Sequence, residues 1–225
     1  MSRESYQERL ATLRADVVGM GDLVGERLEL ALESIRTGDE ELARTVIDGD
    51  DEVNDLYLDL EGDCIDLFAL QQPVATDLRF VATSFKVITD LERIGDLATN
   101  LANYGLAATG EILPEVAIEE IGADAVALVE RALEAYRTDD ADACRTIAAD
   151  DDEIDALCQH ASETVVRDLI EREATDDQLW SIEELLDDVS RVLLTIRDLE
   201  RIADHAVNIA ARTLYMVDSS TELIY

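Results

Sequence analysis

The chain has 225 residues, of which 48% are hydrophobic, so it is long and apolar enough to bury a core of its own. Its 53 acidic residues outnumber 18 basic ones and give a formal net charge of −35, which excludes a surface that attracts nucleic acid or anionic membranes. There is no run of about 18 apolar residues and no signal-like N-terminal segment, so the sequence predicts a cytoplasmic protein without membrane insertion.

The acidic residues are spread over every segment of the chain, and Lys86 is the only lysine. Such a surface is typical of adaptation to concentrated salt. At molar ionic strength the Debye length is about 3 Å, so the acidic side chains no longer repel one another over long distances. We therefore expect a halophilic source; the alternative is an ordinary acidic protein that is equally stable in dilute buffer.

Apolar residues recur at helical spacing almost throughout the chain, and prolines interrupt it only at Pro73 and Pro114. This pattern predicts an all-α protein. Short turns between long helices make sequential helices antiparallel neighbours, so each half is predicted to form a three-helix bundle. The expected helices span 4–36, 39–70 and 75–108 in the first half, and 115–137, 140–172 and 176–217 in the second.

Three cysteines lie inside helix-like runs, at Cys64, Cys144 and Cys158. They lack the CxxC spacing of zinc or redox sites, and an odd number cannot all pair as disulfides. We expect small core residues in a reducing compartment.

The two halves are related by an internal repeat. Shifting the numbering by 101 places Asp50-Asp51-Glu52 on Asp151-Asp152-Glu153, and a shift of 108 places DLERIGDLATN (90–100) on DLERIADHAVN (198–208). The difference between the two shifts means that the second copy has seven extra residues between its second and third helices. We predict two tandem three-helix bundles, over residues 1–112 and 113–225.

The repeated motif has an apolar face and an acidic face when it is placed on a helix. Glu92 and Asp96 lie one turn apart on the acidic side, as do Glu200 and Asp204 in the second copy. Stacked carboxylates repel each other by a few tenths of a kcal/mol, a cost that a divalent cation reverses. The face expected to pack into the bundle carries Val87, Leu91, Ile94, Ala98 and Leu101.

A second pair of oxygen ligands lies near the start of the middle helix of each half: Asp50 with Asn54, and Asp151 with Asp155. The start of the middle helix and the end of the third lie at the same end of an antiparallel bundle. We therefore expect one oxygen-rich patch per half. All-oxygen sites suit Mg²⁺, Ca²⁺, Mn²⁺ or iron, whereas two histidines are too few for zinc. The alternative is a solvated acidic face without metal.

Two residue types in the motif have more than one interpretation. Arg93 and Arg201 directly follow the first acid of each pair and could clamp a carboxylate on a neighbouring helix. His205 is adjacent to Asp204 but corresponds to Leu97 in the first copy, which favours packing over general-base catalysis. The sequence has no nucleophile triad and no glycine-rich phosphate loop, so nothing indicates an enzyme.

Four stretches carry a resemblance to a known family. They are LQQPVATDLR (70–79), DLERIGDLATN with its second copy, MGDLVGERLELAL (20–32) and GDDEVN (49–54). Together they resemble the PhoU family of phosphate-specific transport system accessory proteins, over essentially the whole chain. The resemblance implies a fold of two similar three-helix bundles, in agreement with the repeat.

Members of this family are described as binding multinuclear metal clusters through E(D)xxxD motifs on the bundle surface. The resemblance therefore implies divalent or iron-type metal ions on the acidic pairs of this chain. The equivalent pair formed by Asp50 and Asn54 ends in an amide, so we expect weaker binding there. The positions that match the motif are Glu92, Asp96, Asp151, Asp155, Glu200 and Asp204.

The resemblance also implies regulation rather than catalysis. PhoU-like proteins are negative regulators of phosphate uptake and of the phosphate-starvation response. The implied partners are the ATPase or membrane subunit of a Pst-type phosphate ABC transporter and a sensor or regulator protein. A carboxylate-clustered metal-dependent hydrolase and a metal-free helical scaffold are the alternatives. Elongated bundles often form homodimers, and the candidate edge residues are Tyr6, Phe85 and Tyr215.

Overall fold

The computed structural model describes residues 3–70, 75–107, 116–173 and 182–224. Within these ranges the chain forms seven helices and no strand, which confirms the all-α prediction. The helices of the first half are α1 (Arg3–Thr37), α2 (Glu40–Asp48), α3 (Asp50–Leu70) and α4 (Ala75–Ala107). Those of the second half are α5 (Ile118–Thr138), α6 (Ala141–Glu173) and α7 (Ile182–Asp218).

The prediction of one continuous helix over 39–70 was wrong, because α2 and α3 are separate helices that meet at Gly49. The Gly49 N–H donates to the Val46 carbonyl oxygen at 3.2 Å, a tighter turn than the α-helical ladder makes. Glycine is among the poorest helix formers, so a break at this residue costs little. The equivalent residue in the second copy is Asp150, and there α6 continues without interruption.

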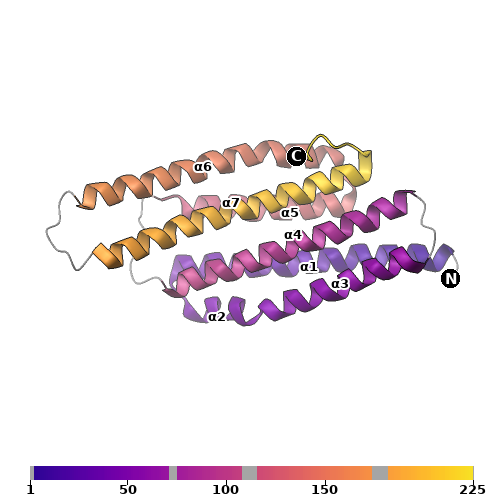
Figure 1. Cartoon of the computed structure of the whole chain (residues 1–225), viewed down its shortest axis with the longest axis horizontal. Helices are drawn as coiled ribbons and strands as arrows, with labels where there is room; N and C mark the ends of the chain where they lie inside the picture. The colour runs from indigo at the N-terminus through magenta and orange to yellow at the C-terminus, as the bar shows by residue number, and fades with distance from the viewer. Residues whose placement is uncertain (1–2, 71–74, 108–115, 174–181, 225) are drawn as a thin grey trace.

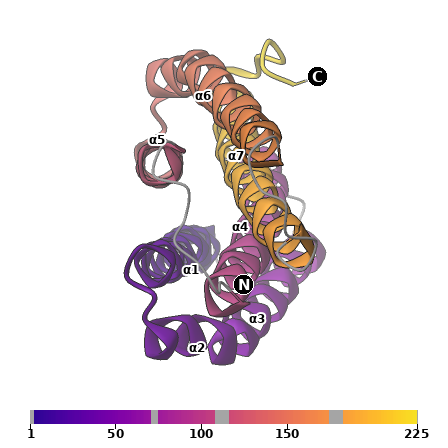
Figure 2. The same cartoon turned by 90° about the vertical axis from the view of Figure 1, so that its left-hand side faces the viewer.

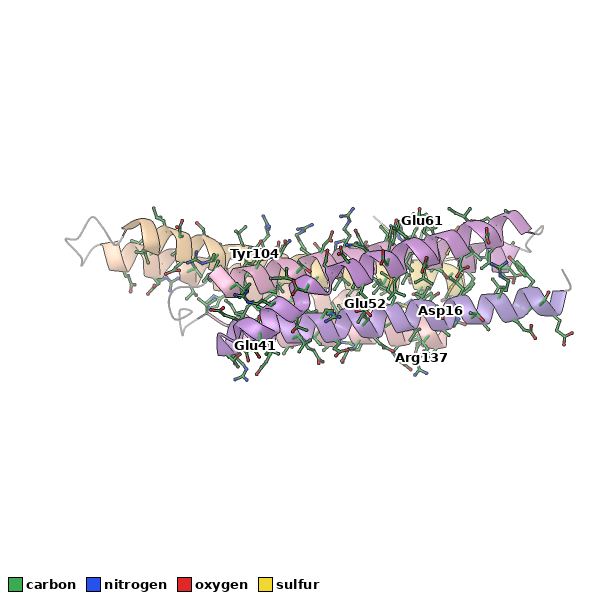
Figure 3. All side chains as sticks on the ribbon, turned by 90° about the horizontal axis from the view of Figure 1, so that it is seen from below. Asp16, Glu41, Glu52, Glu61, Tyr104 and Arg137 are labelled. Carbon is green, nitrogen blue, oxygen red and sulfur yellow. The ribbon has the colours of Figure 1, made fainter. Side chains whose placement is uncertain are left out.

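The side chain of Arg27 on α1 occupies the space beside the break. A Cβ atom at position 49 would lie 2.7 Å from the guanidinium carbon of Arg27, so this close approach requires glycine or a shift of the arginine. Arg27 donates to the Thr45 carbonyl oxygen at 3.3 Å and to the Glu52 carboxylate at 2.8 Å. Figure 3 labels Glu52. The break thus exposes a carbonyl group of α2 that Arg27 satisfies.

The other helices begin and end close to the expected positions. Helix α5 begins at Ile118 rather than at 115. The first residues of the helix expected over 176–217 lie outside the described residues, as do positions 71–73 and Pro114. The three cysteines are buried and unpaired, which confirms their prediction as core residues.

The helices form two layers along an elongated body (Figure 1). Helices α3, α4, α7 and α6 lie side by side in that order, and α1 and α5 cover one side of this row (Figure 2). The two halves therefore meet where α4 packs antiparallel against α7 at the centre of the row. None of the described helices is long and apolar enough to cross a membrane.

The apolar face of the repeated motif forms the centre of this packing. Val87, Leu91, Ile94 and Leu101 have no exposed surface, as the helical periodicity predicts. On α7, Leu199, Ile202 and Ile209 are equally buried, and the counterpart of Val87 is Thr195, which is 4% exposed. Burying each such side chain contributes about 1.5–3 kcal/mol. Tyr6 also has only 3% of its surface exposed, so its prediction as an edge residue of a dimer was wrong.

Polar contacts cross the α4–α7 interface at both ends of the motif. The His205 ring of α7 lies 2.9 Å from the Asp90 carboxylate of α4. In the other direction, the Tyr104 hydroxyl of α4 donates to Asp198 of α7 at 3.0 Å. Asp198 has no exposed surface and also accepts hydrogen bonds from Arg197 at 2.8 and 3.1 Å. The aspartates that begin the two copies of the DLER sequence, Asp90 and Asp198, thus both form polar contacts between the halves.

We predict that Tyr104→Phe lowers the free energy of unfolding by about 1.5–3 kcal/mol, because a carboxylate oxygen of buried Asp198 loses its donor. Burial and the hydrogen bond to Asp198 both raise the pKa of Tyr104, so its hydroxyl remains a donor at neutral pH. The measurement is denaturant unfolding in constant salt. Tyr215→Phe, at an exposed position on the same fold, is the control, and equal midpoints for the two variants would contradict the prediction.

Candidate functional site

The acidic pair of the first half lies on the outer side of α4 and is partly neutralised by its own helix. Arg93 lies 3.4 Å from Glu92 and 3.2 Å from Asp96. Of the two interpretations left open for this arginine, the structure therefore shows ion pairs within its own helix rather than a clamp on a neighbouring one. Glu92 is only 18% exposed, and burial is the main cause that raises its pKa, followed by the charge of Asp96.

The middle helix contributes Asp50 and Asn54 to the same patch, as the antiparallel topology predicts. Asp50 is close enough for its charge to raise the pKa of Glu92. However, each oxygen of Asp50 already accepts a hydrogen bond, from Thr99 at 3.0 Å and from the Asn54 amide at 3.1 Å. In the first-half patch, both oxygens of Asp50 therefore already accept hydrogen bonds, and the charges of Glu92 and Asp96 are partly balanced by Arg93.

The equivalent patch of the second half is different, because all four of its side chains are carboxylates. Asp151 and Asp155 come from α6, and Glu200 and Asp204 come from α7. Burial raises the pKa of Asp151, Glu200 and Asp204, and the charge of Asp155 is the next largest cause for all three. The four acids predicted to gather in the second half therefore do share one electrostatic environment. We call them the α6–α7 acid cluster.

Asp151 is the most strongly affected member of this cluster. Burial and the neighbouring carboxylates raise its pKa to about 6, and its Oδ1 atom is buried without a hydrogen-bond donor. Within the described parts of the chain, no hydrogen bond or ion pair neutralises any member of the cluster. Uncompensated charge of this kind destabilises a fold unless a cation or proton is bound.

Arg201 forms no ion pair with the second cluster. It is the equivalent of Arg93, but its Nη1 atom lies 3.5 Å from the buried Asp198, and its charge reaches the cluster only by lowering the pKa of Asp204, as that of His205 also does. The contact with Asp198 is within its own helix rather than with a neighbouring one. The two acid patches therefore differ in charge although their sequences repeat.

The chemistry of the α6–α7 acid cluster fits a hard cation, since it supplies only oxygen ligands and an excess of negative charge. In the described residues no three histidine, cysteine, aspartate or glutamate side chains are placed closely enough to hold one ion between them. Binding would therefore require the carboxylates to adopt rotamers that point toward a common ion. The first-half patch fits less well because Arg93 and Asn54 occupy its oxygens.

A large cleft formed by described residues lies elsewhere. It has a volume of about 1190 Å³ and lies among the end of α1, the end of α4 and the starts of α5 and α7. Tyr104, which Figure 3 labels, is one of its lining residues. None of the eight predicted site residues lines this cleft. The acid patches are consequently surface features rather than the enclosed pocket that a hydrolase needs.

The PhoU domain family matches the chain twice, over residues 17–105 and 118–213. The chain belongs to the PhoU family. A PhoU homolog of Pseudomonas aeruginosa, described as a phosphate-specific transport system accessory protein, is 31% identical over 218 residues, which cover 95% of this chain and 86% of that protein. Two solved structures superpose closely on this fold, so the prediction of two tandem helical bundles is confirmed.

The first is the crystal structure of PhoU from Pseudomonas aeruginosa, with a TM-score of 0.87, 30% identity, and coverage of 96% of this chain and 100% of that one. The second is the phosphate transport system regulatory protein PhoU from Streptococcus pneumoniae, with a TM-score of 0.85, 27% identity, and coverage of 98% and 99%. The family assignment and the repeat within the chain are therefore two independent indications of the same architecture.

The sequence did not reveal the contacts between the halves of this PhoU-family protein. Asp90 and Asp198 begin the repeated motif, but in so acidic a chain their residue type does not distinguish them from solvated acids. Only their position does, since each lies next to a buried leucine of the motif, at the edge of the apolar face. The sequence favoured a packing role for His205 but did not predict its contact with Asp90.

We predict that Asp151→Asn stabilises the metal-free protein at pH 7.5 and has no effect near pH 4. The folded protein holds this proton more tightly than the unfolded chain, whose aspartates titrate near a pKa of 3.9. Ionisation of Asp151 therefore costs stability as the pH rises from about 4 to about 6. After allowance for solvent screening, we expect a gain of about 1 kcal/mol.

The measurement is denaturant unfolding at both pH values in the presence of a chelator. Asp50→Asn at the equivalent position is the matched control. It should not stabilise the protein at either pH, because Asp50 accepts hydrogen bonds from Thr99 and Asn54. A loss of stability for Asp151→Asn at pH 7.5 would show that its charge is compensated.

Proposed function

We propose that this protein is a cytoplasmic, metal-binding regulator that lowers phosphate uptake and the phosphate-starvation response. It would act by contact with the ATPase or membrane subunit of a Pst-type phosphate ABC transporter. A sensor or regulator protein is the second expected partner. Membership of the PhoU family supports the phosphate part of this proposal, since relatives are named as phosphate transport accessory proteins.

The observation that carries the metal part is the uncompensated α6–α7 acid cluster. The charge of Asp155 raises the pKa of Asp151, Glu200 and Asp204, and Asp151 has a buried oxygen without a donor. A divalent cation would neutralise these carboxylates and remove the electrostatic cost. Asp151, Asp155, Glu200 and Asp204 would supply the ligands, and Arg201 would remain on Asp198.

The two acid patches are expected to differ in their affinity for metal. In the first half, Arg93 already neutralises Glu92 and Asp96, and Asn54 offers an amide where the second half has Asp155. A cation binding there must displace an arginine and gains fewer charges. We therefore infer that the second half binds metal more tightly than the first.

The proposed role is not that of an enzyme. A metal-dependent hydrolase would place its carboxylates in a concave, water-excluding site, but the acids of both halves lie outside the cleft that Tyr104 lines. A metal-free scaffold is the remaining alternative, and it predicts that the acid pairs can be neutralised without loss of regulation.

We predict that Glu200→Gln/Asp204→Asn lowers the affinity of chelator-treated protein for Mn²⁺ by about tenfold or more. Glu92→Gln/Asp96→Asn should have a smaller effect, because Arg93 competes for those oxygens. Calorimetric titration in concentrated salt measures both. The control is Glu119→Gln/Glu120→Gln, which removes the same charge at an exposed site on α5. Mn²⁺ affinities that are equal in all four proteins would remove metal binding from the proposal.

The same variants test the regulatory role in cells. In a deletion strain grown with abundant phosphate, wild-type protein should restore a low rate of phosphate uptake. Glu200→Gln/Asp204→Asn should leave uptake raised, and the α5 control should behave as wild type. If the deletion itself leaves phosphate uptake unchanged, the proposed function is wrong. If the metal-site variant regulates normally, the scaffold alternative is favoured.

We also propose that the protein is adapted to concentrated salt. The net charge of −35 and the single lysine support this, and the surface ion pairs formed by arginines are too few to balance 53 acids. We predict that transfer from molar salt to about 0.05 M salt unfolds the protein, as seen in the far-ultraviolet circular dichroism, because the acidic charges are then screened over a much longer distance. A folded protein of unchanged stability in dilute buffer would contradict the adaptation.

A further inference from the structure

The outer face of the helix row carries exposed apolar side chains that metal binding does not explain. In the first half three of them lie where α3 ends and α4 begins, namely Ile65, Phe68 and Leu78, with exposures of 53%, 37% and 45%, and Leu58, which is 60% exposed, lies about two turns earlier on α3. We call the first three residues the α3–α4 strip. A single exposed apolar residue is ordinary. A group of exposed apolar residues at one end of a helix pair is unusual in a chain with 32% charged residues.

The second half repeats this strip. Val166, Ile170 and Leu186 are 46%, 64% and 45% exposed and lie on α6 and α7. We call them the α6–α7 strip. Val166 is the counterpart of Ile65 under the shift of 101, and Leu186 is the counterpart of Leu78 under the shift of 108. Both positions are apolar and exposed in both copies, so the same surface is built twice.

Each strip lies on the same side of its helices as an acid patch. Ile65 lies about three helical turns beyond Asn54, and Leu78 lies about four turns before Glu92, spacings that return to nearly the same face. Because α3 and α6 run in opposite directions, the two strips lie toward opposite ends of the long axis (Figure 1). The row thus presents two equivalent apolar contacts with the acid patches between them.

Charge indicates what this face contacts. A second copy of the chain placed face to face would bring two acid patches into direct contact, within the Debye length of about 3 Å, where even molar salt leaves like charges repelling each other. A partner with an apolar centre and basic residues around it would be complementary at both strips. A repeated surface is matched most simply by a partner that is itself present twice.

We propose that the α3–α4 and α6–α7 strips form a bivalent docking surface for two equivalent copies of a basic-rimmed protein partner. This inference rests on the proposed function, for it names the surface that contacts the phosphate transporter. Two linked contacts raise the apparent affinity far above that of either one, so each strip needs to bury only a small apolar area.

The test uses the purified ATPase subunit of the phosphate transporter from the same organism as the probe. Sedimentation analysis in concentrated salt should show two ATPase subunits per wild-type chain. Ile65→Gln/Leu78→Gln and Val166→Gln/Leu186→Gln should each bind one subunit, and the combination of all four changes should bind none. Tyr215→Gln/Val217→Gln, at exposed apolar positions at the end of α7, should bind two and is the matched control.

Each other outcome overturns the inference in a recognisable way. Strip variants that still bind two subunits would place the contact elsewhere while leaving the proposed function intact. A wild-type stoichiometry of one would exclude bivalent docking. If the strip changes only convert a dimer of this chain to a monomer, the occupant is a second copy. If wild-type protein binds no ATPase subunit, the partner in the proposed function is wrong and the inference fails with it.

Discussion

The antiparallel packing of α4 against α7 constrains every other feature of the molecule. Both helices carry the repeated motif, and both bury its apolar face completely, so charge can be placed only at the edge or on the outer side of each helix. The acids at the edge, Asp90 and Asp198, pair across the interface with His205 and Tyr104. The acids on the outer side remain available to solvent and ligands. A single helical repeat therefore provides an apolar core, a polar contact between the halves and an acidic surface.

The same interface sets the charge of the two acid patches. In the second half Asp198 is fully buried and attracts Arg197 and Arg201, so Arg201 is drawn away from the outer carboxylates. In the first half Asp90 is paired with His205, and its neighbouring arginine is left to neutralise Glu92 and Asp96. The partner of each edge aspartate thus influences the charge of outer carboxylates that follow it by two and six residues, or about 3 and 9 Å along the helix. Duplication supplied two similar surfaces, and substitution at the interface made them different.

The sequence predicted what depends on periodicity and failed where a single contact decided the outcome. Helical spacing identified the buried face of 90–100, the two bundles and the gathering of Asp151, Asp155, Glu200 and Asp204. It did not predict the break at Gly49, because that break depends on Arg27 approaching from α1. It also left the partners of Arg93 and Arg201 open, and both pair with acids one turn away or adjacent on their own helix. Periodicity gives the face on which a side chain lies, but not which of several nearby partners a long flexible side chain selects.

The outer face of the helix row combines two features that usually oppose each other. Exposed apolar strips promote association, whereas clustered carboxylates prevent it between like-charged proteins. Together they favour association only with surfaces of opposite charge, which makes the acidity a source of specificity as well as of solubility. Binding of a cation at the α6–α7 acid cluster would reduce the negative charge beside the α6–α7 strip and leave the α3–α4 strip almost unchanged. The occupancy of one metal site would then alter the balance between two otherwise equivalent contacts.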